Sequence, residues 1–167
     1  VGGQILNPYN LAKNPGGSSG GTGVAVAAGF ATVGLGTETG VSVRSPAANN
    51  ALVGVVPSRG TVSRAGVLPI SFTQDRVGVH AKSTADAAVV LNAIRGFDAD
   101  DLATTESLAQ PLAELSALPT NNLRGVRVGV LRDLFRKGPE VEAGNAVIDK
   151  QLALMTAGGA IVIDGLS

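Results

Sequence analysis

The chain has 167 residues, enough for one ordinary domain with its own core, and its 44% hydrophobic and 16% charged residues indicate a globular protein rather than a disordered one. Its 13 basic and 13 acidic residues cancel at pH 7, and aromatic residues make up only 3%, which argues against direct binding of nucleic acid. The absence of cysteine excludes disulfides, thiolate metal sites and a cysteine nucleophile, and a single histidine argues against a histidine-rich metal site.

Turn signals dominate the start of the chain, where Asn7-Pro8-Tyr9-Asn10 and Asn14-Pro15-Gly16-Gly17 each predict a turn. A helix is predicted roughly over residues 20–30, with the side chain of Ser19 or of Ser18 as its N-cap. Because this segment is rich in Gly, Ala and Val, it is a poor intrinsic helix former, so tertiary packing must hold it. The longest apolar run, residues 24–33, is too short to span a membrane.

Short elements are predicted next, in the order strand 31–36, turn 37–42, helix 45–51, strand 52–56 and loop 58–74. Pro46 suits the first position of the short helix, and Pro57 ends the second strand. Ser83-Thr84-Ala85-Asp86 approximates a capping box and opens a helix that ends at Ile94, before Gly96. Residues 75–82 are assigned to no element.

The last part of the chain is predicted as a surface excursion over 97–122, acidic at first and then rich in Pro, Ala and Leu, followed by a strand–helix–strand region over 123–167. The two strands are placed at 126–131 and 160–163, and the helix between them at 139–157. This alternation predicts an α/β fold with a mixed β-sheet core surrounded by helices. A chain that begins Val1-Gly2-Gly3, without a signal-peptide pattern, and ends as a strand finishes is expected to be a partial fragment of a longer protein.

Two serine-bearing glycine turns bracket the predicted helix: Gly16-Gly17-Ser18-Ser19-Gly20-Gly21 and Gly36-Thr37-Glu38-Thr39-Gly40-Val41-Ser42-Val43-Arg44-Ser45-Pro46. Glycine lets the backbone approach a ligand closely, and a serine hydroxyl with a base nearby can attack a carbonyl. By composition alone, the first turn fits a flexible Gly/Ser loop equally well. A phosphate-binding loop is disfavoured because no Gly-Lys-Ser or Gly-Lys-Thr follows and Gly34-Leu35-Gly36 lacks a third glycine at the dinucleotide-binding spacing.

These two turns, the small-residue segment between them and Gly54-Val55-Val56-Pro57-Ser58 strongly resemble the amidase signature family. The family comprises serine amide hydrolases such as bacterial amidases, fatty acid amide hydrolase and the A subunit of tRNA-dependent amidotransferases. The resemblance is dense over residues 7–88, the core motif, and from about residue 97 onward the chain is compatible with the family. It implies that residues 1–167 are part of a single amidase-signature domain.

The resemblance implies a catalytic role for each turn. Ser42 would be the nucleophile that attacks the amide carbonyl, and Ser18, on a cis peptide bond with Gly17, would relay protons between Ser42 and a lysine. The reaction would release an acid and ammonia or an amine through an acyl-enzyme, with no cofactor and no metal. The oxyanion hole would consist of four backbone N–H groups, those of Thr39, Gly40, Val41 and Ser42.

Supporting roles are assigned to Gly17, Ser19 and Arg44. Arg44 is expected to hold the second turn by hydrogen bonds, with recognition of a substrate carboxylate as the alternative. Ser19 is expected to cap the helix, with a hydrogen bond that supports Ser42 as the alternative. Glu38 and Asp75 are expected to be turn and network residues rather than acids or bases, and His80 is expected to serve in packing or to lie at the surface.

Two features depart from the family pattern. Val41 stands where many relatives have a second glycine, and it is expected to narrow the acyl side of the pocket and alter the substrate range. The family's general base is a lysine on a strand upstream of the first glycine turn, and this sequence holds no such position. None of the lysines present matches it: Lys13, Lys82, Lys137 and Lys150. The catalytic lysine is therefore expected outside this chain, and the chain alone is expected to be inactive.

The default expectation is a cytoplasmic amidase that acts on a small or aryl carboxamide, without membrane contact, and a homodimer is left open. One alternative is the glutamine-hydrolysing A subunit of a tRNA-dependent amidotransferase. Another is a non-catalytic binding module that keeps the fold. A Val-Lys-Asp-like strand end in the sequence that precedes Val1 would favour an enzyme over the binding module.

Overall fold

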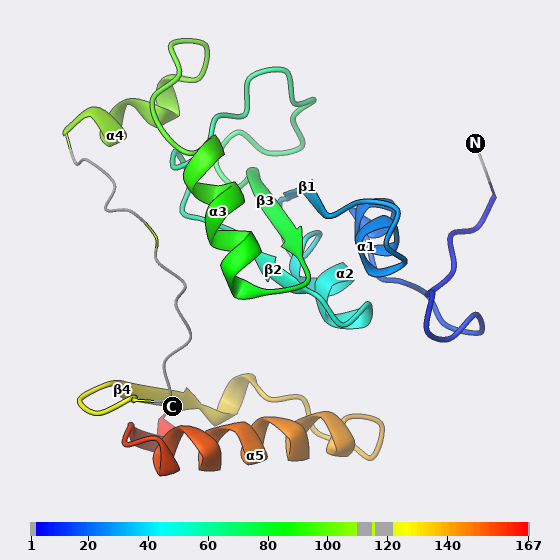
Figure 1. Cartoon of the computed structure of the whole chain (residues 1–167), viewed down its shortest axis with the longest axis vertical. Coiled ribbons are helices and arrows are strands. Elements are labelled where there is room, and N and C mark those ends of the chain that lie inside the picture. The colour runs from blue at the N-terminus through cyan, green and yellow to red at the C-terminus, as the bar shows by residue number, and fades with distance from the viewer. Residues whose placement is uncertain (1–2, 110–114, 116–121, 167) are drawn as a thin grey trace. The chain divides into compact units, whose positions relative to one another are not determined.

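The computed structural model of the chain describes residues 3–109, 115 and 122–166. The chain divides into two compact units, Val1–Ala117 (unit 1) and Leu118–Ser167 (unit 2). Each unit packs helices against a small β-sheet, which confirms the predicted α/β class (Figure 1). Among the described residues, no helix has the length and apolar character needed to cross a bilayer.

Unit 1 is built on an antiparallel sheet of three strands, β1 (Val33–Glu38), β2 (Val53–Val55) and β3 (Arg76–Ala81), in the order β1-β3-β2. The central strand β3 is the element that the sequence analysis left unassigned. Its valines and alanine alternate with Gly78 and His80, so the apolar residues lie on one face and these two on the other. Because glycine and histidine interrupt the apolar run, the strand signal was weak.

Helix α3 (Thr84–Ile94) covers the apolar face of this sheet and forms the main core of unit 1. Its N-cap confirms the capping-box prediction, because the Ser83 hydroxyl accepts a hydrogen bond from the Asp86 backbone N–H (3.1 Å). The buried residues of this core come from β3, from α3 and from the loop after β2: Val62, Val77, Val79, Ala81, Ala87 and Leu91.

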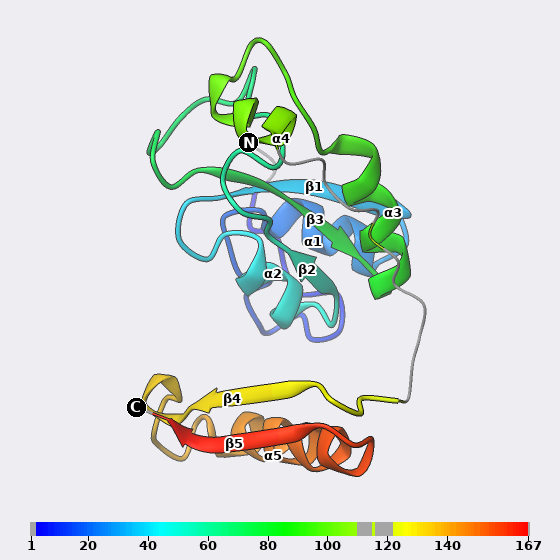
Figure 2. The same cartoon turned by 90° about the vertical axis from the view of Figure 1, so that its left-hand side faces the viewer.

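Helices α1 (Gly20–Ala27) and α2 (Arg44–Asn49) pack on the opposite face (Figures 1 and 2). Glycines make this close approach feasible, since a Cβ on Gly54 would lie 2.5 Å from the Ala47 Cβ, and one on Gly34 would collide with Thr22. Gly34 and Gly54 lie opposite His80 on the two neighbouring strands, so the imidazole stands between glycines. Both serine turns adjoin these two helices, so this face of the sheet positions the candidate site.

Helix α1 ends three residues earlier than predicted. Gly29, with φ +81°, reverses the chain, and the Phe30 N–H bonds back to the Ala25 carbonyl (2.8 Å) in the manner of a glycine C-cap. Strand β1 accordingly begins at Val33 and extends to Glu38, two residues beyond the prediction. Strand β2 lies within the predicted strand 52–56. Helix α2 overlaps the predicted helix 45–51.

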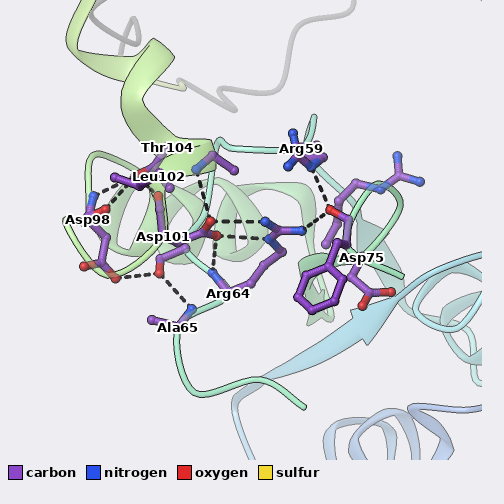
Figure 3. A network of polar contacts seen from close by, with 12 residues as sticks. Arg59, Arg64, Ala65, Asp75, Asp98, Asp101, Leu102 and Thr104 are labelled. Carbon is purple, nitrogen blue, oxygen red and sulfur yellow. Dashed lines mark hydrogen bonds and ion pairs between the residues drawn. The ribbon is translucent and has the colours of Figure 1, made fainter. Parts of the chain in front are cut away.

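The segment after α3 contains a 3₁₀ helix, η1 (Leu102–Thr105), and a short helix, α4 (Glu106–Ala109). Its acidic beginning packs against the loop after β2, because the Asp101 carboxylate pairs with the Arg64 guanidinium (3.0 Å) and Thr104 is fully buried (Figure 3). Of the predicted excursion over 97–122, residues 110–114 and 116–121 lie outside the described residues.

Unit 2 contains β4 (Arg127–Leu131), a 3₁₀ helix η2 (Arg132–Leu134), α5 (Glu142–Ala157) and β5 (Ile161–Leu166). The two strands pair in parallel, with Arg127 opposite Ile161. These elements correspond to the strand, helix and strand predicted from the sequence. Arg132 links them through ion pairs with Asp149 on α5 and Asp164 on β5.

Candidate active site

The Ser18 turn (residues 17–19) carries the first predicted catalytic serine at the start of α1. The Gly17–Ser18 peptide bond is cis, as the family resemblance implied. Behind the turn, the Asn50 side chain donates hydrogen bonds to the carbonyls of Pro15 and Pro46 (both 2.7 Å) and so ties the chain before Ser18 to helix α2. The Ser18 side chain is exposed and lines a cavity of about 260 Å³ together with residues near the N-terminus.

The Ser42 turn (residues 39–42) runs from the end of β1 into α2, and its backbone N–H groups point to no acceptor in the described part of the chain. These are the four groups that the sequence analysis assigned to an oxyanion hole. The next two N–H groups are occupied, since those of Val43 and Arg44 both donate to the Glu38 carboxylate (2.9 and 3.0 Å). The unpaired donors therefore form one continuous run that ends at Ser42.

The buried carboxylate of Glu38 holds the backbone at the end of this turn, and the residue is only 1% exposed. Besides the two backbone donors, it accepts a charge-assisted bond from the Arg44 Nε (2.7 Å). Burial by itself raises the pKa of Glu38, but the hydrogen bonds from Arg44 and Val43 outweigh it and leave that pKa below the usual value. Arg44 also donates to the Gly40 carbonyl (2.6 Å), so its guanidinium braces both ends of the turn.

The two turns contact each other directly, because the Ser19 N–H donates to the Ser42 carbonyl (3.0 Å). The prediction that the Ser19 side chain caps α1 is wrong. Ser19 occupies the N-cap position, but its hydroxyl donates to the Thr37 carbonyl and accepts from the Thr37 N–H (both 3.2 Å), so it makes no cap bond. Gly36 permits this arrangement, since a Cβ there would lie 2.7 Å from the Ser19 Oγ.

The hydroxyls of Ser18 and Ser42 make no hydrogen bond within residues 3–109, 115 and 122–166, to each other or to any other group. The structure therefore brings the two turns together through their backbones, while both hydroxyls stay available to a ligand. Val41, between the candidate donors, is 58% exposed, so its side chain points away from the protein core.

Asp75 supports the other end of the Ser42 turn. Its carboxylate accepts a short bond from the Thr39 hydroxyl and further bonds from the N–H groups of Ile70 (2.8 Å) and Ser71 (2.9 Å). The Thr39 bond, with these two backbone bonds, holds the pKa of Asp75 below its usual value. A carboxylate that is ionised and fully engaged in this way anchors the first residue of the turn.

The sequence analysis did not predict the hydrogen bonds that His80 and Asn50 make. Of the two expectations for His80, packing agrees with the structure: the residue is 0% exposed, and its Nε2 lies 2.8 Å from the Val43 carbonyl, one residue beyond Ser42. No local pattern in the sequence distinguishes Asn50 from the adjacent Asn49. Each residue reaches across the fold to a backbone carbonyl, and that relation leaves no local pattern.

No base of the expected kind accompanies the two serines. Four lysines lie in the described residues, and all four are exposed: Lys13, Lys82, Lys137 and Lys150. In the same part of the chain, no three His, Asp or Glu side chains gather in an arrangement that would hold a metal ion.

Comparison with known proteins identifies relatives over nearly the whole chain. A family model described as Amidase matches residues 1–164. The A subunit of the glutamyl-tRNA(Gln) amidotransferase of Deinococcus deserti is 40% identical over 158 residues, which are 95% of this chain and 31% of that protein. The A subunit of the same name from Roseiflexus castenholzii is 44% identical over 142 residues, 84% of this chain and 28% of its own.

Solved structures give the same relationship. The peptide amidase of Stenotrophomonas maltophilia is 39% identical, with a TM-score of 0.79 over 98% of this chain and 33% of its own. The A subunit of the glutamyl-tRNA(Gln) amidotransferase of Thermotoga maritima is 30% identical, with a TM-score of 0.85 over 97% of this chain and 35% of its own. The chain thus spans about a third of the length of the relatives it matches.

Proposed function

The chain belongs to the amidase family, and from this premise we propose that it carries the nucleophile and the oxyanion hole of an enzyme that hydrolyses a carboxylic amide. The observation that carries the proposal is the run of unpaired backbone N–H groups over residues 39–42, which ends at an accessible serine hydroxyl. Donors fixed where negative charge develops lower the barrier to acyl transfer, and losing one such donor costs about 3–4 kcal/mol of transition-state stabilisation.

In the proposed reaction, the Ser42 Oγ bonds to the amide carbon while its proton passes to the Ser18 Oγ, whose own proton passes to a lysine. The carbonyl oxygen becomes an oxyanion bound by the N–H groups of the Ser42 turn. When the C–N bond breaks, the Ser18 hydroxyl gives its proton to the leaving amine, which departs neutral, and the lysine returns its proton to Ser18. Water then attacks the Ser42 ester while its proton passes through Ser18 to the lysine. When the ester bond breaks, that proton returns to the Ser42 Oγ and the acid is released.

We assign the lysine to a part of the protein outside these residues. A lysine base must be neutral near pH 7, which requires a desolvated or cation-crowded pocket, and all four lysines described here are exposed. This chain alone is therefore expected to be inactive. We also propose that units 1 and 2 belong to one amidase domain, because the family model runs through both of them.

A second candidate is the glutamine-hydrolysing A subunit of a tRNA-dependent amidotransferase, which is favoured by the names of the relatives that are 37–44% identical. A third is a non-catalytic module that keeps the fold. The small-molecule amide partner, the cytoplasmic location and a homodimer belong to the amidase proposal. Hydrolysis of a panel of amides by the full-length protein, with glutamine included, would separate the three candidates. An amidase would hydrolyse aryl or peptide amides alone, an amidotransferase A subunit would hydrolyse glutamine, and a non-catalytic module would hydrolyse none of them.

The decisive test is labelling of the full-length protein with a fluorophosphonate, which should attach to Ser42. Ser42→Ala should abolish the label and lower kcat by about 10³-fold or more, because the nucleophile is lost. Ser18→Ala should slow acylation by about 10²–10⁴-fold without unfolding the protein, because it loses the proton relay. Ser58→Ala, at an exposed loop serine, is the matched control and should label normally. Labelling that survives in Ser42→Ala would defeat the assignment.

A further inference from the structure

His80 occupies the centre of the sheet face that carries both serine turns. Its imidazole is 0% exposed and stands on β3 between two glycines, Gly34 and Gly54, opposite it on the neighbouring strands. Nothing in the proposed acyl transfer uses this side chain. A fully buried, titratable ring in a row of glycines nevertheless occupies a space that any apolar side chain of similar size would fill.

Among the described residues, the ring makes a single hydrogen bond. Its Nε2 lies 2.8 Å from the Val43 carbonyl, and since a carbonyl can only accept, Nε2 carries the proton. The Nδ1 has no hydrogen-bond partner within the described residues. A buried polar nitrogen left without a partner is unfavourable for folding, so histidine is not the choice that stability alone would favour here.

The Val43 carbonyl does not need this donor. It already accepts the N–H of Ala47 (3.1 Å), which is the regular hydrogen bond at the start of α2. If His80 were apolar, no backbone group would lose its last partner, and the orphaned Nδ1 would disappear. The Val43 carbonyl therefore keeps a hydrogen-bond donor without the imidazole. The effect of the imidazole bond must then lie in the position that it gives to the Val43 carbonyl.

The backbone in question is that of Ser42 and its successor. The Ser42 carbonyl accepts from Ser19, the Val43 N–H donates to Glu38, and the Val43 carbonyl accepts from His80, so consecutive peptide groups are fixed from three directions. These peptide planes set the direction in which the Ser42 hydroxyl projects. We propose that His80 is a positioning residue that fixes the Ser42 hydroxyl against its run of N–H donors by holding the Val43 carbonyl. This inference rests on the proposed role of Ser42 as the nucleophile.

The experiment compares His80→Leu and His80→Gln in the full-length protein. Leucine fills the space without a donor, while the glutamine Nε2 amide can reach the same carbonyl. His80→Leu should slow fluorophosphonate labelling and lower kcat by about 10–100-fold, with KM within about twofold, because a small misplacement of a reacting group is enough for such a loss. Its melting temperature should be unchanged or higher. His80→Gln should recover most of the labelling rate.

Leu91→Val is the matched control, because Leu91 is buried on the opposite face of the sheet. It should lower the melting temperature and leave the labelling rate of the folded protein unchanged. Wild-type labelling in His80→Leu, or failure of that variant to fold, would overturn the inference about His80 and leave Ser42 in place. Equal losses in the Leu and Gln variants would also overturn it. Labelling retained in Ser42→Ala would instead defeat the proposed function itself.

Discussion

A single carboxylate, that of Glu38, binds the two backbone N–H groups that directly follow the Ser42 turn. It occupies the donors of Val43 and Arg44 and leaves the preceding run unpaired. The same carboxylate pairs with the Arg44 guanidinium, which bonds back to Gly40. These bonds hold the Gly40 carbonyl within the turn and the two N–H groups that follow it, so loss of the charge should affect both stability and reactivity.

Glu38→Gln should lower the free energy of unfolding by about 1–3 kcal/mol, because the amide nitrogen would face a donor and a buried hydrogen-bonding group would lose its partner. Urea unfolding of the full-length protein measures this change. Glu140→Gln is the control, since Glu140 is exposed and lies 3.9 Å from Arg136, and it should shift stability by no more than about 0.5 kcal/mol. An unchanged unfolding midpoint in Glu38→Gln would contradict a bracing role for this carboxylate.

Among the secondary-structure elements, β2 and α2 show how glycine controls the position of the site. Gly54 on β2 faces Ala47 on α2, and a Cβ at Gly54 would lie 2.5 Å from the Ala47 Cβ and 3.4 Å from the Val43 carbonyl oxygen. The Ala47 Cβ is attached directly to the backbone, so it can yield only if the helix moves. Helix α2 begins two residues after Ser42, so such a movement would be transmitted to the turn.

Gly54→Ala should therefore lower the free energy of unfolding by about 1–3 kcal/mol through overpacking and reduce labelling of Ser42 at the same time. Thermal unfolding and the fluorophosphonate rate measure the two effects. Gly144→Ala in α5 is the matched control of opposite sign, because a Cβ there meets nothing within 4 Å. Alanine in a helix gains up to about 1 kcal/mol over glycine, so this variant should be slightly more stable. A neutral Gly54→Ala would show that α2 can retreat freely.

At the scale of the whole molecule, a polar network in unit 1 connects segments that are far apart in sequence (Figure 3). Asp101 accepts from the Arg64 N–H, Nε and Nη2, and Arg64 also donates to the Phe72 carbonyl (2.8 Å). The same loop ends at Asp75, which holds the Thr39 hydroxyl of the Ser42 turn. The segment over 98–104 is thus connected to the candidate oxyanion hole through one loop.

Asp101→Asn should lower the free energy of unfolding by about 2–3 kcal/mol at pH 7, because it leaves the mostly buried Arg64 guanidinium without its counter-charge. The Arg64 hydrogen bond is the largest cause that holds the pKa of Asp101 well below its usual range. A depressed folded-state pKa stabilises the protein above the unfolded-state value, about 3.9, and this contribution is lost as the pH falls below it.

The difference in stability between the wild type and Asp101→Asn should therefore be constant from about pH 7 to pH 5 and shrink below about pH 4. Urea unfolding across this pH range checks the sign. Asp100→Asn, one residue earlier and exposed, is the control and should stay within about 0.5 kcal/mol of the wild type at every pH. A gap that widens on acidification would refute the ion-pair account.

Local patterns accounted for much of the fold. The Ser83 cap and the apolar face that follows predicted α3, and the alternation after residue 122 predicted β4, α5 and β5. Local patterns did not predict the short strand β3, because it forms through pairing with β1 on one side and β2 on the other. Its Gly78 and His80 weaken the signal along the chain while enabling close packing across it.

The sequence by itself determined the family, the two serine turns and the residues that form them, because glycine, serine and proline at set spacings leave a signature that needs no long-range contact. Tertiary structure alone decided which groups those turns leave free. The Ser19 hydroxyl bonds to Thr37 rather than capping α1, Glu38 occupies two donors and spares the four before them, and His80 reaches Val43 from another strand. Each of these is a hydrogen bond between residues distant in sequence or on different elements, and only the folded chain brings such partners within about 3 Å.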